Sequence, residues 1–174
     1  AYAREGRVRI TRIDLNRIIR ETAAAFAETR KDISVRCDLK EGLHAIDGDP
    51  AQIRQILVNL YINAAEAMPG GGVLGISTEN AEPGEVEGYS SVSDQPKYVR
   101  LLIHDTGVGM DRKTLSKVFD PFFTTKSVGQ GTGLGLASVY GIVKKHGGVI
   151  RVDSEPGRGT SFEIFLPATG MEGV

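Results

Sequence analysis

At 174 residues, the chain has the length of one domain with an adequate core, and a formal net charge of -1 gives no overall attraction to nucleic acid or to an anionic membrane. The single cysteine, Cys37, excludes an internal disulfide, and no Cys or His residues stand at metal-ligand spacing. No apolar run is long enough to span a bilayer. The single cysteine fits a reducing cytosol, so we expect a cytoplasmic location. Because the chain opens without Met, we expect it to be a fragment of a longer protein that is itself soluble or membrane-anchored.

The first forty residues predict a strand, a helix and a second strand. Residues 8–14 favour a short strand, and apolar side chains recur at helical spacing over residues 15–28, with Asp14 as the N-cap. From Ile33 to Lys40 apolar and polar residues alternate, as in a half-exposed strand. Cys37 shares the apolar face, so we expect it in the core.

A short strand at 43–46 precedes a helix with two different faces. Asp49 and Pro50 supply the cap and first turn, and the helix is expected to end near Met68. Beside its apolar stripe runs a polar one, made of Gln52, Gln55, Asn59, Asn63 and Glu66. Two interpretations stay open: an amide network at the surface or between helices, or a neutral oxygen offered by Asn63, with Asn59, to a Mg²⁺ ion that carries phosphates.

The next stretch predicts a turn, a strand, a loose connection and a buried strand. PGGG at 69–72 marks the turn, and residues 73–78 favour a strand. Residues 79–96 are polar and rich in Gly, Pro and Ser, which predicts a mobile hairpin connection. The strand at 98–103 delivers Asp105 to its end, where the carboxylate can accept a hydrogen bond from an exocyclic amine.

Two glycine clusters bracket the stretch after Asp105. Gly107 and Gly109 follow the strand, and the second cluster opens a helix near Gly133 that runs to residue 145. Such a helix start offers backbone N–H groups and a positive dipole end to phosphates. Between the clusters we expect a short helix from Asp111 to Lys117. Three phenylalanines (Phe119, Phe122 and Phe123) anchor the loop, and Lys126 either meets phosphate or is a solvated surface lysine. Residues 148–154 and 160–167 predict an antiparallel hairpin.

Several known motifs do not fit. The chain lacks GxxxxGK[ST], and Leu136 stands where the third glycine of GxGxxG belongs. HRD and DFG sequences are also absent. The triplet at 105–107 matches an aspartic protease, but one triplet would require a dimer and leaves the polar helix unexplained.

Four boxes stand in order: QILVNLYINAAEAM at 55–68, DTGVGM at 105–110, FDPFFTTK at 119–126 and GTGLGL at 131–136. Together they resemble the GHKL superfamily of gyrase, heat-shock chaperone, histidine kinase and mismatch-repair ATPases. They are most similar to the catalytic ATP-binding domain of a sensor histidine kinase of the nitrogen-regulation type.

The resemblance implies a Bergerat-type ATP-binding fold, an α/β (α+β) two-layer sandwich in which helices cover one face of a mixed sheet. It places the catalytic ATP-binding domain at 15–167. Residues 1–14 would end a linker from an upstream dimerisation and phosphoacceptor domain and include the first strand, and residues 168–174 would be a C-terminal tail.

The resemblance also implies the site. Asp105 would bind the adenine amine, Gly107 and Gly109 would admit the base, and Thr160 would support the adenine contact through water. Asn63, with Asn59, would ligate Mg²⁺, and Lys126 would neutralise phosphate charge. The remaining nucleotide contacts would come from Met110, Phe119, Gly131, Thr132, Gly133, Leu134, Gly135 and Leu136.

At two positions the chain differs from the motifs of these families in a way that affects the expected reaction. The ATPase branches have a Glu four residues before the metal-binding Asn, whereas this chain has Asn59, which favours transfer over hydrolysis. Glu66 stands where many histidine kinases have a phosphate-contacting lysine. We expect Mg²⁺ to carry more of the charge neutralisation as a result.

The resemblance implies ATP and ADP as ligands, a histidine of the upstream dimerisation domain as phosphoacceptor, and a downstream response-regulator receiver domain as partner. None of His44, His104 and His146 is expected to be the acceptor, and we expect no nucleic-acid partner. The isolated domain should be a monomer and its parent a homodimer. The alternatives are a nucleotide-binding regulatory module without catalysis and a serine kinase of the anti-sigma type.

Overall fold

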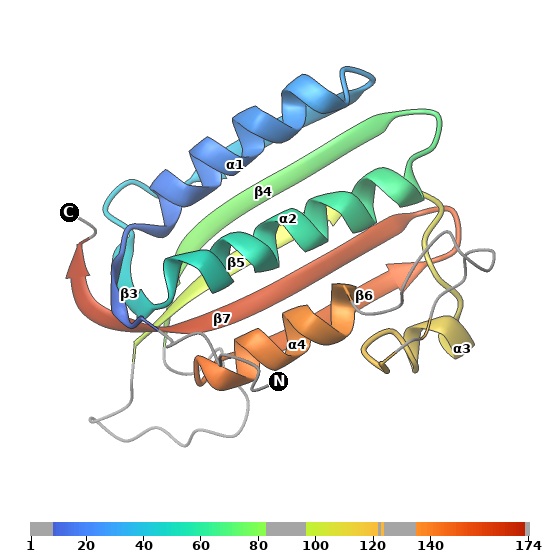
Figure 1. Cartoon of the computed structure of the whole chain (residues 1–174). Coiled ribbons are helices and arrows are strands. Elements are labelled where there is room, and N and C mark those ends of the chain that lie inside the picture. The colour runs from blue at the N-terminus through green and yellow to red at the C-terminus, as the bar shows by residue number, and fades with distance from the viewer. Residues whose placement is uncertain (1–8, 83–96, 122, 124–134, 173–174) are drawn as a thin grey trace, which may run out of the picture.

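The computed structural model describes residues 9–82, 97–121, 123 and 135–172 (Figure 1). In these residues the strands form one mixed sheet in the order β1-β3-β7-β5-β4-β2, with β6 paired to β7. Only the β2–β4 pair is parallel among the described pairs. The strands are β1 (Thr11–Ile13), β2 (Ile33–Leu39), β3 (His44–Gly48), β4 (Gly72–Ala81), β5 (Tyr98–Asp105), β6 (Val149–Glu155) and β7 (Gly159–Glu172).

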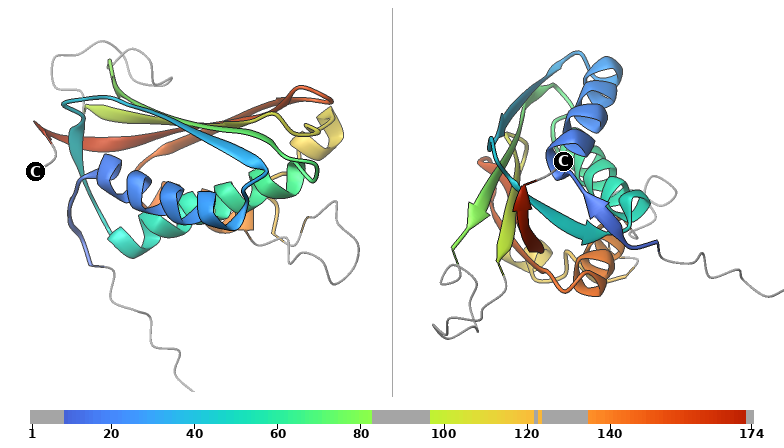
Figure 2. Two further views of the ribbon diagram at one scale, coloured as in Figure 1. Left: turned by 90° about the horizontal axis from the view of Figure 1, so that it is seen from above. Right: turned by 90° about the vertical axis from the view of Figure 1, so that its left-hand side faces the viewer.

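Three helices form the second layer. Figures 1 and 2 show α1 (Leu15–Thr29), α2 (Pro50–Ala67) and α4 (Gly135–Lys145) side by side on one face of the sheet, with α2 in the middle. The short α3 (Arg112–Leu115) lies at the end of the sheet where β6 and β7 meet. The predicted two-layer α/β sandwich is confirmed.

The helix starts are set locally by their caps, as predicted. The side chain of Asp14 accepts a hydrogen bond from the backbone N–H of Arg17 at 3.2 Å. Asp49 accepts from Ala51 N–H at 2.9 Å, and Pro50 occupies the first turn of α2. Each cap satisfies a backbone donor that has no partner inside the helix.

The core lies between the helices and the sheet. The apolar stripe predicted for α2 is buried there: Ile53, Ile56, Leu57, Leu60 and Ala64. Beyond the polar stripe, Val58 and Ile62 are 39% and 49% exposed. The amides of α2 therefore stand between a dry core and an exposed apolar edge.

The prediction that Cys37 is buried is wrong. The alternation along β2 is real, since Ile33 is buried and Val35 and Leu39 pack against the core. Cys37 shares that face but is exposed. Because β2 is the last strand in the sheet order, it has a strand neighbour on one side alone and its face is incompletely covered.

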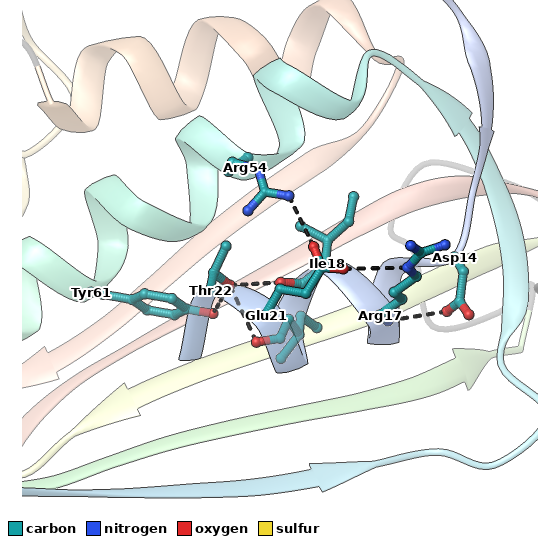
Figure 3. Close-up of polar contacts among 8 residues, drawn as sticks. Asp14, Arg17, Ile18, Glu21, Thr22, Arg54 and Tyr61 are labelled. Carbon is teal, nitrogen blue, oxygen red and sulfur yellow. Dashed lines mark hydrogen bonds and ion pairs between the residues drawn. The ribbon is translucent and has the colours of Figure 1, made fainter. Parts of the chain in front are cut away.

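Two buried polar side chains of α1, Asn16 and Thr22, fix it on its neighbours. The hydroxyl of Thr22 lies 2.8 Å from the carbonyl of Ile18 and 3.0 Å from the hydroxyl of Tyr61 on α2 (Figure 3). Asn16 donates to the carbonyl of Lys40 at 2.9 Å and accepts from Thr78 at 2.8 Å. These contacts connect α1 to α2 and to the β2 and β4 side of the sheet.

Some element bounds differ from the predicted ones. The strand predicted at 73–78 continues to Ala81, and the last strand continues past Pro167 to Glu172, where it pairs with β3. These extensions come from pairing with distant strands, which the local pattern does not contain. The predicted mobile connection falls largely on residues 83–96, outside the described residues.

Candidate functional site

Asp105 lies at the end of β5 and is 4% exposed. Its Oδ1 accepts a hydrogen bond from the backbone N–H of Gly107 at 2.8 Å. Burial raises the pKa of Asp105 above its ordinary value, while backbone hydrogen bonds from Gly107 and Thr160 and the charge of His104 act to lower it. The result is a buried acceptor that gains from any further donor, such as an amine.

The loop after Asp105 is held between α2 and the β6–β7 turn. Val108 donates to the carbonyl of Ala67 at 3.0 Å and accepts from the N–H of Gly157 at 2.7 Å. A Cβ at Gly107 would collide with the carbonyl oxygen of Ala67, and a Cβ at Gly109 would collide with the carbonyl oxygen of Glu155. Gly109 also has a φ of +70°. Both glycines are thus required by close backbone packing within the protein.

Ser154, a residue that the sequence analysis did not select, joins this loop to Thr160. Its Oγ accepts from the N–H of Met110 at 2.8 Å, donates to the carbonyl of Gly159 at 2.9 Å and lies 2.8 Å from the hydroxyl of Thr160. Thr160 is 5% exposed. The alternation of β6 could have placed Ser154 on the inner face, but its partners become visible only with the strand pairing.

The polar stripe of α2 faces the start of α4. Gln55 donates to the hydroxyl of Ser138 at 3.0 Å, and Asn59 donates to the carbonyl of Gly135 at 3.2 Å. These two amides form the network between helices that was one of the two open interpretations. Asn63, the next residue of the stripe, is partly buried.

The other end of α4 is tied to the start of α2 by His146. Its Nε2 accepts from the N–H of Asp49 at 3.1 Å, and its Nδ1 lies 2.8 Å from the carbonyl of Ile142. Because Nε2 accepts here, Nδ1 is the nitrogen that donates to Ile142. The histidine is therefore committed to a structural contact at both ring nitrogens.

Phe119 anchors the segment after α3. Its ring lies 5.4 Å from that of Tyr140 on α4 and 6.4 Å from that of Phe162 on β7, centre to centre. Leu136 packs partly against the core. The predicted anchoring role of Phe119 agrees with these contacts, whereas Phe122 lies outside the described residues. The remaining predicted site residues outside the description are Lys126, Gly131, Thr132, Gly133 and Leu134.

The described residues contain no group of three or more His, Cys, Asp or Glu side chains that could hold a metal ion. Asn59 donates through its amide nitrogen to Gly135, so its carbonyl oxygen remains an acceptor, and Asn63 stands one turn further along α2. One or two neutral oxygens suit a Mg²⁺ ion that brings phosphate oxygens and water with it. They do not make a metal site without the nucleotide.

Comparison with known proteins identifies a family of ATPases and a sensor kinase as similar to this chain. The family described as "Histidine kinase-, DNA gyrase B-, and HSP90-like ATPase" matches residues 48–170. The chain is 42% identical over 170 residues to the sensor kinase CckA of Brucella abortus, an alignment that covers 96% of this chain and 18% of CckA. The chain thus spans less than a fifth of that relative.

Two solved structures, one of them of the histidine kinase ThkA, share the fold. Full-length ShkA in complex with AMPPNP superimposes with a TM-score of 0.76 at 26% identity, covering 95% of this chain and 32% of ShkA. ThkA in complex with the response regulator protein TrrA gives a TM-score of 0.70 at 25% identity, covering 93% of this chain and 42% of ThkA.

Within the described residues, no helix is both long and apolar enough to cross a membrane.

Proposed function

Since the chain belongs to the histidine kinase-, DNA gyrase B- and HSP90-like ATPase family, we propose that it binds Mg·ATP and donates the γ-phosphate to a histidine on a separate dimerisation domain. The observation that carries this proposal is the buried carboxylate of Asp105, held beside Thr160 at one end of the sheet by the pairing of β5 with β7. A buried carboxylate whose burial disfavours its charged form gains from a donor such as the adenine amine.

The proposed division of labour follows the positions of the side chains. Asp105 and Thr160 receive the base, and the amides of α2 lie toward the start of α4, where the second glycine cluster begins its helix. Asn63, with Asn59, would hold Mg²⁺, which when bound supplies charge neutralisation on the phosphates. Catalysis then comes from orientation and electrostatic stabilisation, because Asn59 stands where the ATPase branches have the Glu that activates water.

Asn59 also supports transfer over hydrolysis. It occupies the position of the Glu that activates water in the ATPase branches, and an amide cannot act as a general base. Its amide nitrogen is already committed to the carbonyl of Gly135. We therefore assign Asn59 to holding the start of α4 as well as to assisting the metal.

The partners of the proposed kinase come from its relatives. ShkA has been solved with AMPPNP, an ATP analogue, and ThkA with the response regulator TrrA, which supports ATP as donor and a receiver domain as the next phosphoacceptor. The phosphoacceptor histidine would lie on an upstream domain of a homodimeric parent. The domain alone should be a monomer with little kinase activity.

Calorimetric titration of the purified chain tests nucleotide binding. We expect ADP and a non-hydrolysable ATP analogue to bind, more tightly with Mg²⁺ than without it, and GTP to bind poorly. A folded chain that binds none of them in either condition contradicts the proposal.

Adding the upstream dimerisation and phosphoacceptor domain of the parent protein tests the transfer step. The longer protein should form an acid-labile phosphoprotein with ATP, as expected for phosphohistidine. An acid-stable product would indicate a serine kinase instead. Tight ATP binding without any phosphoprotein would indicate a regulatory module that has lost catalysis.

The role of Asn63 is tested by Asn63→Ala. This variant should bind the ATP analogue without Mg²⁺ as the wild type does, but lose most of the additional affinity that Mg²⁺ gives, because a neutral ligand of the ion is removed. Arg54→Ala on the same helix is a matched control, since Arg54 contacts Glu21 of α1 at 3.1 Å (Figure 3). An unchanged Mg²⁺ effect in Asn63→Ala would move the metal to other residues.

A further inference from the structure

Ser154 lies on β6, where this strand meets the loop after Asp105 and the start of β7, at the end of the site that would bind the nucleotide base. Its hydroxyl contacts the backbone N–H of Met110, the carbonyl of Gly159 and the hydroxyl of Thr160, all between 2.8 and 2.9 Å. Pairing of Ser154 with Thr160 across β6 and β7 sets this geometry. Because the Ser154 side chain is only partly exposed, water competes weakly for its hydrogen-bond partners.

The contacts of Ser154 determine which way the Thr160 hydroxyl points. A serine hydroxyl has one hydrogen, and here it is donated to the carbonyl of Gly159. The N–H of Met110 donates to the same oxygen. The hydrogen in the contact between the two hydroxyls must therefore come from Thr160.

With its hydrogen committed to Ser154, Thr160 offers only lone pairs to a ligand. Asp105 lies beside it, because the pairing of β5 with β7 sets His104 opposite Ser161 and so brings Asp105 next to Gly159 and Thr160. A carboxylate and an oriented hydroxyl together form an edge that accepts hydrogen bonds and does not donate them. Such an edge complements an exocyclic amine and opposes a carbonyl at the same place.

We propose that Ser154 sets the base selectivity of this site by holding the Thr160 hydroxyl as an acceptor, so that a 6-amino purine is favoured over a 6-oxo purine. This inference rests on the proposed function, because it concerns the nucleotide that the site would bind. Ser154 acts through Thr160 and is a positioning residue for specificity.

The experiment compares ADP with inosine diphosphate, which differs at position 6 by a carbonyl in place of the amine. Dissociation constants of both are measured calorimetrically with Mg²⁺ for the wild type and for Ser154→Ala, Ser154→Cys and Ser154→Thr. Ser161→Ala is the matched control: Ser161 lies on the same hairpin, pairs with Asp153, and by strand alternation faces the opposite side of the sheet from Thr160. Thermal unfolding of each variant verifies that it is folded.

In Ser154→Ala the Thr160 hydroxyl is free to rotate and to donate to a carbonyl. We expect the preference for ADP over inosine diphosphate to fall about tenfold, which corresponds to about 1.4 kcal/mol. Ser154→Thr, which keeps the hydroxyl, should restore most of the preference, and Ser161→Ala should keep it. Ser154→Cys, whose thiol bonds weakly, should resemble alanine and provides the result if Ser154→Ala does not fold.

The outcomes are separable. A folded alanine or cysteine variant with the wild-type ratio of the two dissociation constants overturns the inference, even if both nucleotides bind more weakly, because a purely structural role would weaken both alike. A wild type that binds neither nucleotide overturns the proposed function itself, and this inference with it.

Discussion

At the scale of single residues, the burial of the Asp105 carboxylate is unfavourable in the free protein and becomes favourable when a ligand donates a hydrogen bond to it. Asp105 is 4% exposed, and its carboxylate accepts a hydrogen bond from the backbone N–H of Gly107. Burial still dominates and raises its pKa. An ionised group in this state costs folding free energy and repays that cost when a ligand donates to it.

Asp105→Asn should weaken ADP binding by about 1 to 3 kcal/mol, because a charged acceptor is replaced by an amide whose nitrogen is a donor. Calorimetric titration with ADP measures the loss. Thermal unfolding establishes that the variant is folded. Wild-type affinity in a folded Asp105→Asn protein would remove this residue from base recognition.

The raised pKa of Asp105 also predicts a pH dependence. The folded protein holds this proton more tightly than the unfolded chain does, so ionised Asp105 lowers stability at neutral pH, and that loss is relieved as pH falls through the raised pKa. ADP affinity should change in the opposite sense and decrease over the same pH range, because the ligand needs the ionised acceptor. The phosphates of ADP titrate too, so the informative quantity is the ratio of wild-type to Asp105→Asn affinity at each pH. A ratio independent of pH on the acidic side would contradict this assignment.

At the scale of elements, the three helices are joined by polar contacts as well as by the core. α2 meets α1 through Thr22 and Tyr61, and it meets α4 through Gln55 and Asn59. The contact with α1 is buried, whereas the contacts with α4 are exposed. Hydrogen bonds open to water contribute little net stability, so the two hydrogen bonds between α2 and α4 contribute less than the buried one between α1 and α2.

The buried contact gives a stability prediction. Thr22 donates to the carbonyl of Ile18, so the hydroxyl of Tyr61 donates to Thr22 (Figure 3). Tyr61→Phe removes that bond but keeps the tilted ring contact with Phe26 at 5.6 Å. We expect the free energy of unfolding at neutral pH to fall by about 1 kcal/mol in denaturant titrations. Tyr140→Phe, at a side chain 42% exposed, is the control and should change little.

Tyr61 also contributes to the dependence of the free energy of unfolding on pH above neutrality. Burial raises the pKa of Tyr61 from 10.0 to about 12. Above pH 10 the unfolded chain loses this proton while the folded protein keeps it, so stability falls until the folded group also ionises. The loss amounts to about 3 kcal/mol. Tyr61→Phe should lack this part of the alkaline decrease, and an equally steep decrease in the variant would show that other groups cause it.

At the scale of the whole molecule, sheet order assembles the site from segments far apart in the chain. The pairing of β5 with β7 sets His104 opposite Ser161, which brings the end of β5 to the start of β7. The pairing of β6 with β7 adds Ser154. The end of α2 then contacts the loop after Asp105 through Ala67. A ligand at this place would bridge both layers of the sandwich.

Ligand binding should therefore stabilise the whole domain. Mg·ADP at 100 times its dissociation constant should add about 2.7 kcal/mol, and each kcal/mol raises the unfolding temperature of a domain of this size by about 2 to 4 °C. We expect a rise of about 5 to 11 °C in calorimetric scans. The rise should be much smaller for Asp105→Asn at the same ADP concentration. An equal rise in both proteins would place the ligand elsewhere.

Features that depend on near neighbours could be predicted from the sequence. The caps at Asp14 and Asp49 and the buried face of α2 follow from residues within one or two turns. The order of the four boxes led to the family, and its implied two-layer fold is the one observed. The roles assigned to Asp105, Asn63 and Thr160 remain predictions, although their positions in the fold are compatible with them.

Only the tertiary structure decided how these local elements meet. The pattern around Cys37 could not reveal that β2 lies at the edge of the sheet, and nothing near Ser154 indicated its contact with Met110. The packing of Gly107 against Ala67 likewise depends on where α2 ends relative to β5. Sequence periodicity determines which face of an element is apolar, because it depends on the geometry of one element. Exposure and long-range hydrogen bonds depend on strand order and register, which arise from the packing of all the elements together.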